Sequence, residues 1–102
     1  MYTSRYTRSV AQDIEFEWDE ENRKHLAAHE VTEAEFEYVM TNNAVDLGYE
    51  LIDEEERYRV VGLTTSGRLL TAVWTPRNGR VRAVTAFPAT VLDKKAFVEM
   101  SQ

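Results

Sequence analysis

The chain contains no cysteine and no long apolar run. The missing thiols exclude disulfides, thiolate catalysis and cysteine-based zinc sites. The longest apolar stretches, such as 72–74, are far too short to span a bilayer. Arg5 and Arg8 are not followed by the apolar core of a signal peptide. We therefore expect a cytoplasmic protein without a membrane segment.

The chain is also short, with 102 residues, of which 43% are hydrophobic. This share excludes wholesale disorder, and the length allows one domain. Residues 1–12 are polar and lack periodicity, so we interpret them as a flexible tail before a single domain at 13–102. A chain of this size buries only about 60–70% of its unfolded surface, so a partner or a homodimer could contribute to its stability.

The net charge of −6 hides a strong asymmetry. Residues 13–56 carry sixteen acids against Arg23 and Lys24, whereas residues 57–102 carry eight basic residues against Asp93 and Glu99. A basic block inside an acidic protein has two interpretations. It is either a solvated strand face or a surface that binds a polyanion.

The first half alternates between strand and helix signals. Residues 14–18 alternate apolar with acidic, which predicts a half-buried strand. Asp19 can cap a helix that ends near His29, and Thr32 with Glu35 has the spacing of a capping box for a second helix that ends at 42–43. Residues 45–51 alternate like a strand, and the acidic run 53–56 predicts an exposed loop.

The second half predicts three strands and a helix. The strands are 58–63, 68–75 and 80–87, the second turn contains Asn78-Gly79, and the helix is 91–100. Short turns between strands favour antiparallel pairing. We predict an α+β fold of order β-α-α-β-β-β-α, with an antiparallel twisted sheet and its helices on one face.

The order of these segments resembles the BrnT-like toxin family. The similar segments cover roughly residues 14–97 and include 16–19, 61–64, 67–70, 73–75 and 80–86. The resemblance implies a RelE-like fold, metal-independent RNA cleavage and neutralisation by an antitoxin protein. Family members usually have Gly, Arg and Tyr where this chain has Glu30, Phe87 and Phe97. A catalytically silent relative that acts as a protein-binding module or a homodimer is the rival hypothesis.

The resemblance and the basic block together define candidate site residues. The catalytic candidates are His29, Arg68 and Arg82; the candidates for RNA binding are His25, Arg59, Arg80 and Thr85. Guanidinium groups suit bidentate phosphate contacts, and histidine can act as a general base. The competing interpretations are pairing of the arginines with acids of the first helix and a helix-end role for the histidines.

Three further predictions concern the geometry and ligands of this site. Arg80 and Arg82 are two positions apart and should share a face, with Arg68 beside them across the hairpin. Trp18 and Trp74 could stack on bases, but core packing is the favoured interpretation. We expect no metal and no small-molecule cofactor; RNA and an antitoxin are the candidate partners.

Overall fold

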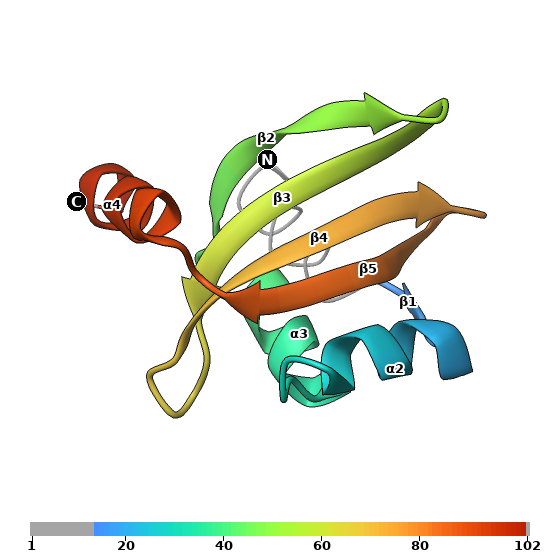
Figure 1. Ribbon diagram of the computed structural model, residues 1–102, viewed down its shortest axis with the longest axis horizontal. Helices are drawn as coiled ribbons and strands as arrows, with labels where there is room; N and C mark the ends of the chain where they lie inside the picture. The colour runs from blue at the N-terminus through green and yellow to red at the C-terminus, as the bar shows by residue number, and fades with distance from the viewer. Residues whose placement is uncertain (1–13, 102) are drawn as a thin grey trace, which may run out of the picture.

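A computed structural model describes residues 14–101, and the proposed tail at 1–12 lies outside this range. None of the helices in this range is long and apolar enough to cross a membrane. Figure 1 shows a twisted sheet with α2 and α3 beside it and α4 at its far end. The elements are β1 (Phe16–Glu17), α2 (Glu20–Ala27), α3 (Glu33–Thr41), β2 (Val45–Ile52), β3 (Glu55–Leu63), β4 (Leu69–Arg77), β5 (Arg80–Pro88) and α4 (Val91–Met100).

Within residues 14–101, the sheet has five strands in the order β1-β5-β4-β3-β2. β1 runs parallel to β5 and the other pairs are antiparallel, so the purely antiparallel sheet of the prediction is wrong. The predicted order β-α-α-β-β-β-α has one strand fewer than the structure. The additional strand is β2, which the alternating segment after α3 forms. The acidic run is a turn at 53–54, and Glu55 and Glu56 already belong to β3. The expected strand at 14–18 is reduced to two residues.

Side-chain caps fix where the first two helices begin. The Asp19 carboxylate accepts a hydrogen bond from the main-chain amide of Asn22 at 2.9 Å. The side-chain oxygen of Asn22 accepts one from the main-chain amide of Asp19 at 2.8 Å. Thr32 and Glu35 form the same reciprocal pair, which confirms the predicted capping box. Each box satisfies two amides that the first helical turn leaves free.

The helices cover both faces of the sheet, and the expected placement on one face is wrong. On one face, α2 and α3 enclose the main core, built from Leu26, Val31, Phe36, Val39, Leu70, Ala72, Ala83 and Ala86. Trp18 and Trp74 pack against it, as the favoured interpretation held. Thr71 lies between Leu70 and Ala72 and therefore points to the other face, where its hydroxyl donates to Asp93 of α4 at 2.6 Å.

A β-bulge interrupts β5 in its middle. Trp74 is opposite Ala83 and Val73 is opposite Thr85, so Val84 is the extra residue. A bulge shifts the alternation of the side chains that follow it. Thr85 and Phe87 consequently point to the same face as Arg82, while Ala86 enters the core. The bulge thus determines which side chains of β5 reach the face opposite the main core.

Candidate functional site

The open face of the sheet is the face opposite the main core, and β-sheet register arranges its side chains in three rows. In one row, Arg82 of β5 is opposite Thr75 of β4. Arg57 of β3 lies on the other side of Thr75, because the residues next to them, Tyr58 and Trp74, are paired. The other two rows are Arg59, Val73 and Thr85, and Val61, Thr71 and Phe87. α4 packs on the last row through Asp93. Basic side chains therefore concentrate on the part of the face that α4 does not cover.

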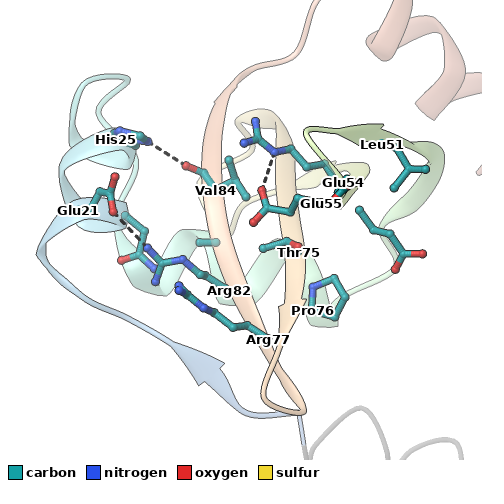
Figure 2. A pocket seen from close by; sticks show the side chains of 14 residues that line it. Glu21, His25, Leu51, Glu54, Glu55, Thr75, Pro76, Arg77, Arg82 and Val84 are labelled. Atoms are coloured by element: carbon teal, nitrogen blue, oxygen red, sulfur yellow. Dashed lines mark hydrogen bonds and ion pairs between the residues drawn. The ribbon is translucent and has the colours of Figure 1, made fainter.

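A cavity of about 770 Å³ lies at this uncovered end. Figure 2 shows side chains converging on it from α2, the β2–β3 hairpin and the β4–β5 hairpin. The lining residues are Glu21, Asn22, His25, Leu51, Glu54, Glu55, Glu56, Arg57, Thr75, Pro76, Arg77, Arg82, Ala83 and Val84. Three arginines and a histidine share this cavity with four glutamates. The charges of the three guanidiniums and four carboxylates nearly cancel, and leave a net charge of −1 apart from His25.

Arg82 is the most enclosed cation of the cavity, with only 11% of its side chain exposed. Its Nη1 lies 2.6 Å from Asp19 Oδ2 and 3.4 Å from Glu17 Oε2, and its Nη2 lies 3.5 Å from Glu21 Oε1. The hydrogen bond to Asp19 raises the pKa of Arg82, and the same bond lowers the pKa of Asp19 below its usual 3.8. Arg82 therefore carries a permanent positive charge in a fixed position.

His25 reaches the cavity from α2, and one contact fixes its tautomer. Its Nδ1 lies 3.2 Å from the carbonyl oxygen of Val84, the extra residue of the bulge. A carbonyl oxygen can only accept, so the neutral ring carries its proton on Nδ1. Nε2 is then an unprotonated acceptor. A general base requires this form. In histidine, the hydrogen bond of one ring nitrogen usually determines whether the other nitrogen carries a proton.

Arg57 and Arg77 line the cavity although they were not among the predicted site residues. Arg57 Nε lies 2.9 Å from Glu55 Oε1, and Arg77 Nη1 lies 3.7 Å from Glu17 Oε2. The signal for Arg57 was its spacing of two from Arg59, which puts both on one strand face. Arg77 follows Pro76 in a predicted turn, and its sequence position contains no comparable signal.

Arg68 occupies the opposite end of the ribbon from Arg82. Seven strand steps of about 3.3 Å place it about 23 Å from Thr75, which is paired with Arg82. The prediction that Arg68 lies beside Arg80 and Arg82 is wrong, because the hairpin pairs Arg80 with Arg77. The guanidinium of Arg68 donates to the carbonyl of Glu30 at 2.8 Å and lies 3.4 Å from Glu35 Oε2. It therefore holds the α2–α3 connection.

The remaining predicted residues separate into three locations. His29 is at the Arg68 end, where its ring contacts Phe87 edge-on at 6.0 Å between centroids. Arg59 and Thr85 share the middle row of the open face, and Arg59 Nη2 pairs with Asp93 at 3.2 Å. Arg80 lies at the start of β5, 3.3 Å from Glu15 Oε1. Arg68, Arg80 and Arg82 are thus all paired with carboxylates, but only Arg82 pairs with an acid of the first helix, Glu21, as the competing interpretation expected.

Comparison with known proteins gives a family for most of this structure. Residues 18–92 match the family described as ribonuclease toxin, BrnT, of type II toxin–antitoxin system. No curated protein matches the chain. The matched range begins just before α2 and ends at the start of α4, so it contains every residue of the cavity lining.

Proposed function

The chain belongs to the BrnT family of type II ribonuclease toxins, and on this premise we propose that it cleaves RNA at the cavity of the open face. The observation that carries the proposal is the convergence of His25, Arg57 and Arg82 on one cavity. A phosphodiester needs positive charge beside its oxygens and a base beside the ribose 2′-hydroxyl. These three side chains supply both within a single site.

His25 serves as the base in this mechanism. Its Nε2 removes the proton of the 2′-hydroxyl, and the 2′-oxygen then attacks the adjacent phosphorus. The bond from phosphorus to the 5′-oxygen breaks, and a proton from solvent completes the new 5′-hydroxyl. The products are a 2′,3′-cyclic phosphate and a 5′-hydroxyl end. This reaction uses only proton transfer and electrostatic stabilisation, so it places no demand on a metal ion.

The arginines divide the electrostatic work. Arg82 is held by Glu17, Asp19 and Glu21, so it provides a fixed charge at the back of the cavity. Among the described residues, Arg57 pairs with one carboxylate, that of Glu55, and its side chain is one-third exposed. It can therefore turn towards a phosphate at a smaller cost than Arg82 can. We assign the direct phosphate contact to Arg57. Arg82 provides the fixed positive charge at the back of the cavity.

Cleavage of a short fluorescent RNA by the purified chain tests the proposal. We expect His25→Ala to lower the cleavage rate by about 10²-fold or more, the typical loss of a general base. Arg57→Ala should lower it by about 10²-fold, as for one lost transition-state contact. Arg23→Ala is the matched control, because Arg23 is an exposed arginine of α2 that pairs with Glu33 outside the cavity. A cyclic phosphate at the cut end identifies the mechanism.

Equal rates in the wild type and in His25→Ala would refute the assignment of the base. His29→Ala separates the two histidines, since His29 does not line the cavity. A chain that leaves RNA intact under all conditions would favour the second candidate function, a protein-binding module. The observation behind this alternative is the exposure of Val91 and Leu92 on α4, two apolar side chains without cover within residues 14–101. The RelE-like fold, the cytoplasmic location and the antitoxin partner stay predictions.

A further inference from the structure

β2 lies at an outer edge of the sheet that the described residues form. Within residues 14–101, β2 pairs with β3 alone. An edge strand presents a row of amide and carbonyl groups that another extended chain can pair with. Many proteins protect such edges with inward-facing charges or proline. In β2, a bulge between Asp46 and Gly48 interrupts the first part of the strand, and beyond it the strand exposes Tyr49 and Leu51, with relative exposures of 59% and 64%.

An aromatic stack holds the apolar surface of this edge in place. The rings of Tyr49 and Tyr58 stack with centroids 5.3 Å apart, and those of Tyr58 and Trp74 stack at 4.7 Å. Trp74 packs against the main core. Tyr49 is therefore supported from beneath, and Leu51 lies two residues further on the same face. A partner strand would contact an apolar surface that is already ordered. Binding would therefore cost little conformational entropy at this surface.

The charge around the edge selects the chemistry of the partner. Residues 45–57 carry six carboxylates and one guanidinium, that of Arg57. Within the described residues, Asp53 and Glu54 at the hairpin turn form no ion pair. A second copy of the chain would place the same acids beside each other, which is unfavourable. A strand that alternates basic with apolar residues would match both the carboxylates and the apolar surface.

From this combination we infer that the β2 edge is the docking site for a basic extended segment of a partner protein, which joins the sheet as a sixth strand. The cavity is lined by Leu51 of this edge and by Glu54, Glu55 and Glu56 of the turn and strand that follow it. An added strand would therefore run along the mouth of the cavity and restrict access of RNA to Arg57. The regulatory part of this inference rests on the proposed function, RNA cleavage at the cavity. The docking itself does not depend on RNA cleavage.

A synthetic octapeptide of alternating lysine and valine is a direct probe for the edge. We expect saturable binding to the full chain below about 1 mM, with slower hydrogen exchange at the amides of 45–52. An octapeptide of alternating glutamate and valine should not bind. Absence of binding by the lysine peptide, or protection confined to another element, would overturn the inference. Both measurements are made without RNA, so they are independent of any result on cleavage.

The turn of the hairpin provides a variant that removes charge while it preserves the fold. Asp53 and Glu54 both have positive φ, at 53° and 66°, and the sequence Asn-Gly is the preferred one for such a turn. The double variant Asp53→Asn/Glu54→Gly should therefore fold at least as well as the wild type. We expect its affinity for the lysine peptide to fall about five- to ten-fold at low salt. An unchanged affinity would show that charge does not select the partner.

Leu51→Lys tests the apolar part of the surface. A lysine at an edge position discourages strand addition, so peptide binding should weaken about ten-fold or more. Glu99→Lys, on the exposed end of α4, is a control variant for charge and should leave binding unchanged. Sedimentation at increasing concentration tests the rival occupant. A dimer that Leu51→Lys abolishes would overturn the inference in favour of self-association.

Discussion

The two ends of the β4–β5 ribbon present arginines in different chemical settings. At one end, Arg68 donates to the main-chain carbonyl of Glu30. At the other end, Arg82 is held by the side-chain carboxylates of Asp19, Glu17 and Glu21. A main-chain carbonyl is fixed by the fold, so the end with Arg68 serves the fold. At the other end, the carboxylates hold the charge of Arg82 in place beside the cavity, where the proposed phosphate contact is made by Arg57.

Replacement of Arg68 should have the largest effect, because it should lower stability and leave RNA cleavage at the other end nearly unchanged. Arg68→Ala removes a charged donor from the Glu30 carbonyl and an ion pair with Glu35. We expect the free energy of unfolding to fall by about 1–2 kcal/mol, since hydrogen bonds to charged groups are worth more than neutral ones and this one is partly exposed. Urea denaturation measures the loss. RNA cleavage per folded molecule should change by less than about three-fold, the spread expected away from a site. A loss of cleavage without a loss of stability would restore the catalytic role predicted for Arg68.

Glu30, at the Arg68 end of the ribbon, has a strained backbone. Its φ is 58°, in the left-handed region that glycine adopts without strain. Glu30→Gly should raise the free energy of unfolding by about 1 kcal/mol. The Arg68 contact should survive, because it uses the Glu30 carbonyl and not its side chain. Thermal melting of the variant beside the wild type measures the gain, and an unchanged or lower melting temperature would contradict the prediction.

Acidification affects the end with Arg82 and has the smallest expected effect. The pKa of Asp19 in the folded chain is lowered below 3.8, chiefly by the hydrogen bond from Arg82. A lowered pKa contributes stability above pH 3.8, and this contribution disappears as the pH falls through the folded value. Asp19→Asn keeps a good helix cap but removes the charge. The difference in stability between wild type and variant should therefore be largest near pH 7 and should vanish in acid, as measured by urea denaturation from pH 2 to 7. A difference that is independent of pH would contradict the assignment.

Local signals predicted much of this fold. The capping residues Asp19 and Thr32 set the helix starts, and Asn78-Gly79 set the β4–β5 turn, because each acts through atoms within a few residues. The parallel pairing of β1 with β5 was not predictable in this way. It joins Phe16 to Val81 across most of the chain, and a two-residue strand has almost no pattern of its own.

The candidate site was predicted only in part, and the bulge in β5 explains much of the difference. Simple alternation would put Arg82, Val84 and Ala86 on one face. The extra residue Val84 shifts the second half of the strand, so Thr85 joins Arg82 instead. The same bulge brings the Val84 carbonyl to His25 and fixes its tautomer. A sequence pattern that identifies residue types cannot reveal one unpaired residue in a strand, because the bulge depends on how β4 and β5 pair.

The stack of Tyr49, Tyr58 and Trp74 also makes the edge of the sheet observable by light. Tyrosine transfers its excitation to a nearby tryptophan, and these rings are in contact, with centroids 5.3 and 4.7 Å apart. Tyr49 stands at the exposed edge and Trp74 lies against the core, so the stack links solvent and interior. We expect this emission to change when a partner covers Tyr49. The protein thus carries an intrinsic fluorescent reporter at its own edge strand, and no attached dye is needed to follow what arrives there.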